Sequence, residues 1–152
     1  MKLLVIGSGG REHAMAWRLA RSPSVRKLYA APGNPGMANV AECRQPESSS
    51  PEAFLDLANS LDAELTVVGP EAPLVAGVVD RFRQAGRLIV GPAAAAARLE
   101  GSKIFAKEAM QRYGVPTARY VTVDNYADAI SALSGFSYPL VLKADGLAAG
   151  KG

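Results

Sequence analysis

The sequence predicts an α/β protein with an open, mostly parallel sheet and helices on both faces. Short apolar runs alternate with stretches that repeat apolar residues at helical spacing, an alternation typical of βαβ units. The run Leu3–Ile6 is continuously apolar, as expected of a central strand that is covered on both faces. Glycine and proline follow several of the runs, which predicts tight turns at the carboxyl ends of the strands, where open α/β sheets bind ligands.

The first strand is predicted at Leu3–Ile6, with a glycine turn after it and a helix over 11–21 that Ser22-Pro23 ends. A second strand, 27–31, leads into a Pro/Gly-rich loop at 32–36. The later elements of this part are a helix that begins at Ser50-Pro51, a strand at 65–68, one helix that carries Leu74, Val78, Phe82 and Ala85, and a strand at 88–90. Cys43 is expected in or near a strand.

A domain boundary is predicted around 100–102, which divides the chain into domains 1–101 and 102–152. Ser102 can cap a helix that runs to Tyr113, and Gly114 and Pro116 end it. The expected elements that follow are an extended run at 119–123, a helix at 125–133, a strand at 140–143 and a mobile glycine- and alanine-rich loop at 144–152.

Composition excludes several classes of protein. About half of the 152 residues are hydrophobic and the net charge is +3, without the clustered Lys/Arg and interleaved aromatics of a nucleic-acid surface, so we expect no nucleic-acid partner. No apolar run is long enough to span a membrane, and Met1 leads directly into a core strand, so we expect neither a membrane partner nor a signal peptide, and a cytoplasmic location. The single cysteine, Cys43, excludes a disulfide framework and a cysteine metal cluster.

The turn after the first strand contains Gly7, Gly9 and Gly10. Free backbone N–H groups and the helix dipole at such a turn favour an anion, although a purely structural turn has the same sequence. A dinucleotide fingerprint would need a third glycine where Arg11 to His13 stand, and an acidic residue after the second strand, which instead ends in Ala-Ala-Pro-Gly. A nicotinamide cofactor is therefore not expected.

Five motifs together resemble the glycinamide ribonucleotide synthetase family, also called phosphoribosylamine-glycine ligases. In chain order they are VIGSGGREHA, APGNPG, VVGPEAPLVAGVVD, LEGSK and LVLKADGLAAGKG. Each motif alone is weak, but their order and spacing along the whole chain are specific. The resemblance implies a pre-ATP-grasp domain, followed by the incomplete start of an ATP-grasp domain.

The resemblance also implies an activity in de novo purine biosynthesis. Family members join glycine to 5-phosphoribosylamine and split ATP to ADP and phosphate: ATP phosphorylates the glycine carboxylate, and the amine attacks the acyl phosphate. The implied partners are these small molecules, and the implied cofactors of the longer enzyme are ATP and Mg²⁺ or Mn²⁺. Its metal ligands would lie outside these residues, so we expect no metal site here and no activity of this chain alone.

The resemblance assigns roles to several residues, each beside a simpler alternative. Lys143 and Lys103 would contact ATP phosphates, although either could be a surface lysine, and a loop from Gly146 to Gly152 would close over the phosphates. The ATP-binding candidates are Lys103, Lys143, Gly146, Gly150, Lys151 and Gly152. No catalytic residue is assigned.

Substrate candidates lie in the first domain. Gly9, Gly10 and Arg11 would bind the phosphate of phosphoribosylamine, and Glu71 would hold a ribose hydroxyl or the amine, or else brace its own loop. His13 is expected to pack or hydrogen-bond at the helix start, and Asp145 to cap or brace its loop or to touch a ligand. Two other hypotheses stay open at this point, a dinucleotide-binding oxidoreductase domain and a non-catalytic scaffold.

Overall fold

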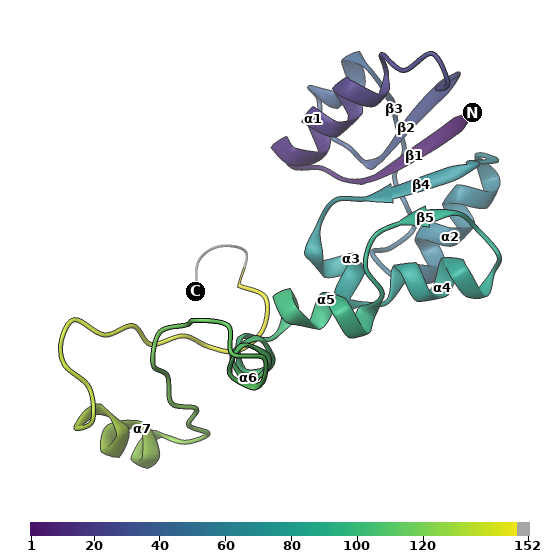
Figure 1. Cartoon of the computed structure of the whole chain (residues 1–152). Helices are drawn as coiled ribbons and strands as arrows, with labels where there is room; N and C mark the ends of the chain where they lie inside the picture. Colours follow the sequence, from purple (N-terminus) through teal and green to yellow (C-terminus); the bar gives the residue numbers. More distant parts are fainter. Residues whose placement is uncertain (149–152) are drawn as a thin grey trace. The chain divides into compact units, whose positions relative to one another are not determined.

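The computed structural model describes residues 1–148. The chain forms two compact units, of which the first is Met1–Ala97 and the second begins at Arg98 (Figure 1). The division falls inside helix α5 (Ala94–Gly101).

The first unit is built on a five-stranded sheet in the order β3-β2-β1-β4-β5, and every neighbouring pair is parallel. The strands are β1 (Lys2–Gly7), β2 (Lys27–Pro32), β3 (Glu42–Cys43), β4 (Leu65–Val68) and β5 (Ile89–Val90). The central strand β1 pairs Leu3 with Leu28 on one side and with Leu65 on the other. The predicted α/β fold with an open parallel sheet is confirmed.

Alternate residues of β1 feed two separate cores, because successive side chains of a strand point to opposite faces. Leu4 and Ile6 pack in a cluster with α2 (Pro51–Ser60) and α4 (Val78–Gln84), whereas Leu3 and Val5 pack with α1 (Gly10–Leu19). Figure 1 shows α1 on one side of the sheet and α2 and α4 on the other. The continuous apolar run of β1 therefore reflects burial on both faces.

Local sequence accounts for the ends of the helices in the first unit. The Ser50 hydroxyl accepts the N–H of Ala53 at 3.1 Å, and Pro51 occupies the first helical position, so α2 begins where the sequence predicted. Helix α1 ends at Leu19, two residues before the predicted end, and Ala20 is its exposed C-cap.

The single helix predicted from Leu74 to Ala85 is wrong. The structure has two helices, α3 (Glu71–Val75) and α4 (Val78–Gln84), separated at Gly77. Gly77 has φ of 91°, a left-handed conformation that glycine adopts without steric cost and that a continuous helix does not contain. The apolar spacing continues across the break, so the pattern alone did not reveal it.

Two short elements follow β2. The 3₁₀ helix η1 (Met37–Asn39) lies directly after the Pro/Gly-rich loop, and the two-residue strand β3 contains Cys43. The prediction that Cys43 lies in or near a strand is confirmed.

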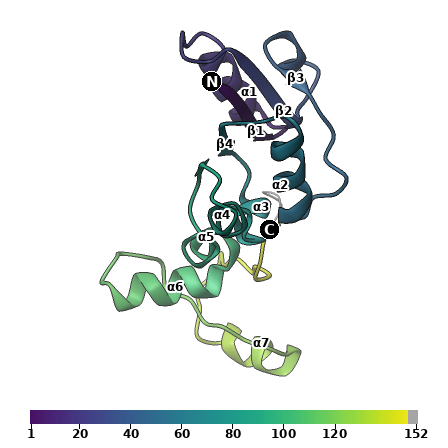
Figure 2. The ribbon, with the colours of Figure 1, turned by 90° about the vertical axis from the view of Figure 1, so that its right-hand side faces the viewer.

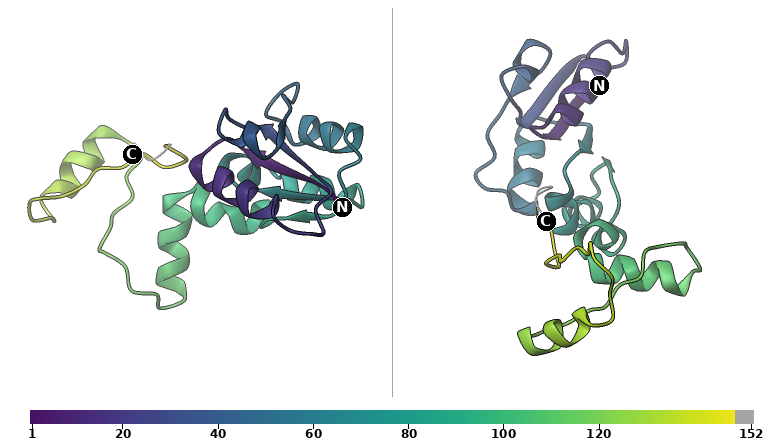
Figure 3. Two further views of the ribbon diagram at one scale, coloured as in Figure 1. Left: turned by 90° about the horizontal axis from the view of Figure 1, so that it is seen from above. Right: turned by 90° about the vertical axis from the view of Figure 1, so that its left-hand side faces the viewer.

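The second unit contains helices α6 (Lys103–Arg112) and α7 (Tyr126–Leu133), joined by an irregular segment (Figure 2). Ser102 and Asn125 cap them by accepting the N–H groups of Phe105 and Asp128. The strand predicted at 140–143 does not form, because a strand needs a hydrogen-bonded neighbour and no part of 98–148 pairs with it. Irregular chain lies on both sides of α7 in Figure 3.

None of the helices within 1–148 has the length and apolar character that a membrane crossing requires.

Candidate functional site

Three turns of the first unit meet at the carboxyl edge of its sheet. The register pairs Gly7 with Pro32 and Ile6 with Val68, so the turns after β1, β2 and β4 start side by side. They contain the predicted substrate residues Gly9, Gly10, Arg11 and Glu71. Ligands of open parallel sheets bind at this edge.

Glu12 is the buried centre of this edge. Its residue is only 3% exposed, and its carboxylate accepts the backbone N–H of Gly9 at 2.7 Å and the Nε–H of Arg11 at 3.0 Å. A Cβ added to Gly7 would lie 2.5 Å from Glu12 Cγ, and one added to Gly69 would overlap the Glu12 side chain. Glycine at these two positions therefore makes the space that Glu12 fills between β1 and β4.

Arg11 joins two of the turns. Its Nη2 donates to the carbonyl of Gly69 at 2.6 Å and to the Glu71 carboxylate at 3.0 Å. The bonds to Glu12 and then to Glu71 raise the pKa of Arg11, while the pKa of Glu71 is lowered by a bond from its own backbone N–H and then by Arg11. Arg11, Glu12 and Glu71, here called the carboxyl-edge cluster, carry one positive and two negative charges.

The first turn of α1 has backbone N–H groups that the helix cannot satisfy. The N-cap is Gly9, which has no side chain to accept them, and the first bond of the turn is from the N–H of His13 to the carbonyl of Gly9. The N–H of Gly9 itself is taken by Glu12. Gly10 and Arg11 are exposed, and their N–H groups have no protein acceptor within 1–148. These two N–H groups, rather than that of Gly9, are therefore open to an anion.

The loop after β2 is fixed to the glycine turn by Asn34. The Asn34 amide donates to the carbonyl of Ser8 at 2.8 Å and accepts the N–H of Met37 at 2.8 Å. His13 lies against this loop, since a Cβ on Gly36 would be 2.6 Å from its Cε1. The expectation that His13 packs at the helix start agrees with this contact.

The second unit brings together two predicted nucleotide residues. The Nζ of Lys103 donates to the carbonyl of Gly146 at 2.7 Å. Asp145 accepts the N–H of Lys103 at 2.6 Å, that of Ile104 at 3.2 Å, and the hydroxyl of Ser102 at 3.0 Å. The bond from Ile104 is the main cause that lowers the pKa of Asp145, with the Ser102 hydroxyl next among the bonds. Asp145 thus caps α6 and braces its own loop.

The other predicted nucleotide residues are placed differently. Lys143 is exposed and lies two residues before Asp145. The structure does not describe Gly150, Lys151 and Gly152. The expected mobile loop, 144–152, is therefore described only over 144–148. Within its described part, Asp145 and Gly146 are held by α6.

Glu12 and Asn34 were not predicted as site residues. Glu12 stands three residues after the N-cap, the spacing of a capping box, which could have identified it. The glycine N-cap obscured this pattern, because a capping box has Ser or Thr there. Asn34 stands in a Pro/Gly turn where an Asn side chain commonly bonds nearby backbone.

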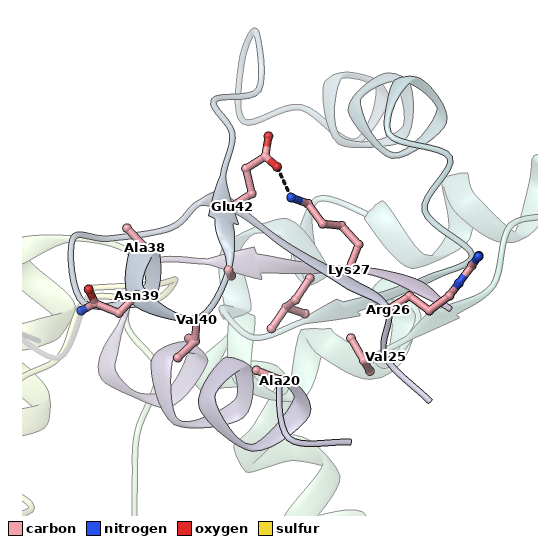
Figure 4. Close-up of a pocket in the computed structure, with 10 residues that line it drawn as sticks. Ala20, Val25, Arg26, Lys27, Ala38, Asn39, Val40 and Glu42 are labelled. Atoms are coloured by element: carbon pink, nitrogen blue, oxygen red, sulfur yellow. Dashed lines mark ion pairs between the residues drawn. The ribbon is translucent and has the colours of Figure 1, made fainter. Parts of the chain in front are cut away.

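A hollow of about 500 Å³ lies at the opposite, amino-terminal edge of the sheet. Residues that line it include Ala20, Lys27, Val40 and Glu42. Figure 4 shows the ion pair between two of these lining residues, Lys27 and Glu42, whose Nζ and Oε2 atoms are 2.5 Å apart. None of the predicted site residues lines this hollow.

Comparison with known proteins gives two consecutive family matches. Residues 1–100 match the N domain of phosphoribosylglycinamide synthetase, and residues 101–152 match its ATP-grasp (A) domain. Curated relatives named phosphoribosylamine–glycine ligase include those of Clostridium acetobutylicum, 49% identical over 152 residues, and Xylella fastidiosa strain Temecula1, 55% identical over 154 residues. Each match covers the whole chain and 36% of the relative, so the chain spans about a third of their length.

Solved structures agree with these matches. The phosphoribosylamine–glycine ligase of Thermotoga maritima superimposes with a TM-score of 0.80 at 34% identity, over all of this chain and 35% of that one. The N5-carboxyaminoimidazole ribonucleotide synthetase of the same organism shares the fold, with a TM-score of 0.66 at 19% identity over 91% of this chain and 37% of that one. The two consecutive domain matches and the superposition on the Thermotoga maritima enzyme show that this chain belongs to the phosphoribosylglycinamide synthetase family.

Proposed function

We propose that this chain forms the substrate-side domain and the first part of the nucleotide domain of an ATP-dependent ligase. The ligase joins glycine to 5-phosphoribosylamine and releases ADP and phosphate, a step of de novo purine biosynthesis in the cytoplasm. The observation that carries the proposal is the pair of consecutive domain matches over 1–100 and 101–152. The domain boundary at 101/102 is part of this proposal.

The carboxyl edge of the first unit provides the chemistry for a sugar phosphate that carries an amine. The open N–H groups of Gly10 and Arg11 at the start of α1 suit the phosphate. Glu71 is 40% exposed on its side chain and is oriented by Arg11 at 3.0 Å, so its carboxylate can accept hydrogen bonds from a ribose hydroxyl or from the amine. Gly9 contributes through its position at the N-cap, since its own N–H is bonded to Glu12.

Lysines of the second unit provide charge for nucleotide phosphates. Lys103 and Lys143 would contact ATP, and Gly146 with Gly150, Lys151 and Gly152 would form the loop over its phosphates. Lys103 is already beside this loop through its bond to Gly146. The longer family members use ATP with Mg²⁺ or Mn²⁺. Within 1–148 no three His, Cys, Asp or Glu side chains could hold a metal ion together, so we assign no step of metal chemistry to these residues.

The decisive experiment expresses the product of the intact gene and measures phosphate release. We expect release that depends on both glycine and phosphoribosylamine, and none from the 152-residue chain alone. In the active protein, Lys143→Ala should lower kcat/KM by about 10²–10³-fold, the scale of losing one preorganised charge-stabilising group. Glu108→Gln, on an exposed residue of α6, is the matched control and should keep full activity.

Several outcomes would contradict the proposal. Release without glycine would exclude the ligase, and a stop codon directly after Gly152 would favour a non-catalytic scaffold. NADH fluorescence enhancement on titration would favour the dinucleotide-binding alternative.

Phosphate binding at the glycine turn is tested separately on the 152-residue chain. Inorganic phosphate should shift the amide signals of Gly10 and Arg11 in NMR spectra. Gly10→Leu should abolish this shift and leave the fold intact, because a Cβ at Gly10 would point into open space, with nothing within 4 Å. Ala14→Leu, at an exposed position of α1, is the matched control. Phosphate shifts confined to other regions would show that the turn is structural.

A further inference from the structure

We propose that Glu12 is the positioning residue of the carboxyl edge, which holds Arg11 and, through Arg11, sets the Glu71 carboxylate for recognition of the sugar hydroxyls or amine. The inference rests on the proposed function for the identity of the ligand, and adds to it a residue that touches no ligand. It starts from a buried carboxylate that the substrate assignments leave unused.

The burial of Glu12 requires an explanation, because a carboxylate that is 3% exposed loses its hydration and needs charged or hydrogen-bonding partners. Its two oxygens have separate partners. Oε2 accepts the N–H of Gly9, and Oε1 accepts the Nε–H of Arg11. One carboxylate therefore connects the cap of α1 to the Arg11 guanidinium.

The Arg11 guanidinium transmits this constraint to the turn after β4. A guanidinium is planar, so fixing Nε and Nη2 fixes the whole group. Nη2 meets the carbonyl of Gly69 at 2.6 Å and Glu71 Oε1 at 3.0 Å. Nη1 has no protein acceptor within 1–148. The chain of contacts thus runs from a buried residue to an exposed carboxylate at the mouth of the edge.

The charges of the carboxyl-edge cluster distinguish two parts of the site. Arg11 is balanced by Glu12 and Glu71, which leaves a net charge of one negative unit. This cluster favours hydroxyl or amine donors over phosphate, whereas the N–H groups at Gly10 and Arg11 favour the anion. Glu12 should therefore matter for the sugar part of a ligand and much less for its phosphate.

Glu12→Gln separates the positioning role from simple filling of space. The amide has nearly the same shape, and its oxygen can still accept the N–H of Gly9. Its NH₂ group then faces the Nε–H of Arg11, donor against donor, and releases the guanidinium. Arg11→Gln breaks the same series of contacts between Glu12 and Glu71. The Arg11 side chain is 57% exposed, so this variant should fold and remains informative if Glu12→Gln does not fold. Glu52→Gln, in an exposed ion pair on α2, is the matched control.

The test compares two probes, ribose 5-phosphate and inorganic phosphate, by NMR titration of the 152-residue chain. We expect Glu12→Gln and Arg11→Gln to weaken ribose 5-phosphate by about tenfold, the value of one hydrogen bond to a charged group. In Glu12→Gln the affinity for inorganic phosphate should change less than twofold, and Glu52→Gln should change the affinity for neither probe. In a Glu71→Gln background the Glu12→Gln effect should largely disappear, which a purely structural role would not produce.

The outcomes separate this inference from the proposed function. Equal ribose 5-phosphate affinity in wild type and Glu12→Gln overturns the positioning role, as does an equal loss for both probes. If wild type binds neither probe, the proposed substrate assignment fails. The positioning role of Glu12 is then tested by the rate at which the Arg11 Nε–H proton exchanges with solvent. Slow solvent exchange of that proton in wild type and fast exchange in Glu12→Gln support it, and equal exchange overturns it.

Discussion

The carboxyl edge of the first unit and the start of α6 in the second unit are held by the same kind of hydrogen bond, but the carboxylate is buried in the first and exposed in the second. In each, a carboxylate accepts a backbone N–H at a helix start and lies beside a basic side chain. Glu12 is 3% exposed and bonds Gly9, three residues away. Asp145 is exposed and bonds Lys103, 42 residues away.

The difference teaches how each site is held. Glu12 is fixed by packing as well as by hydrogen bonds, since Gly7 and Gly69 leave room only for its side chain. Asp145 is fixed by its hydrogen bonds alone, and a Cβ on the neighbouring Gly146 would meet nothing within 4 Å. Changes of volume should therefore disturb the first region most, and changes of hydrogen bonding or pH should disturb the second.

The largest expected effect is that of Gly7→Ala. The new Cβ would lie 2.5 Å from Glu12 Cγ and 2.8 Å from Pro70 Cδ, at a residue with φ of 131°. Overpacking and the unfavourable backbone together should lower the free energy of unfolding by about 3 kcal/mol. Urea unfolding measures it.

Two further glycines serve as comparisons for Gly7→Ala. Gly10→Ala, in open space, should leave the first unit's stability unchanged or raise it by about 0.5–1 kcal/mol. Gly146→Ala should cost its unit about 1 kcal/mol, since only the backbone penalty at its positive φ applies. Equal losses at Gly7 and Gly146 would contradict the distinction between a packed and an open region.

Much of the fold was predictable because its signals are local. The run Leu3–Ile6 is apolar throughout, and Leu65–Val68 is apolar except for Thr66, which is 1% exposed. Such runs are typical of strands that are buried on both faces. Ser50 and Ser102 cap helices that begin immediately after them. The break at Gly77 was missed because the apolar spacing of Leu74 and Val78 continues through it.

The remaining features depend on residues far apart in the sequence. Residues 140–143 have the composition of a strand, but a strand also requires a neighbour to pair with. The bonds that the Ser102 hydroxyl and the Lys103 N–H donate to Asp145 join residues 43 and 42 positions apart, and no local pattern specifies them. Glu12 is local, yet its burial between Gly7 and Gly69 depends on β1 and β4 being adjacent.

A smaller effect is expected when the hydrogen bonds that hold the start of α6 in the second unit are weakened. Asp145→Asn keeps the size of the side chain but loses the charge that accepts from Lys103, Ile104 and Ser102. We expect the amides of Lys103 and Ile104 to exchange with solvent several-fold faster, because the helix cap is weakened. Asp124→Asn, at an exposed residue of the same unit, should leave these rates unchanged. Faster exchange throughout α1 and β1 would instead indicate a global effect.

The smallest effect is a pH dependence of the same cap. The pKa of Asp145 is lowered from its ordinary 3.8, first by the Ile104 N–H and then, among the other bonds, by the Ser102 hydroxyl. The folded protein therefore binds this proton less readily than the unfolded chain does, so the cap contributes fully above about pH 4 and is lost as the pH falls through the lowered pKa. The Cγ signal of Asp145 should titrate below 3.8, together with the amide signals of Lys103 and Ile104. In Asp145→Asn the amide signals should show no such step. A midpoint of the Asp145 titration at or above 3.8 would mean that hydrogen bonds alone do not hold the exposed carboxylate, and the contrast with buried Glu12 would then need another cause.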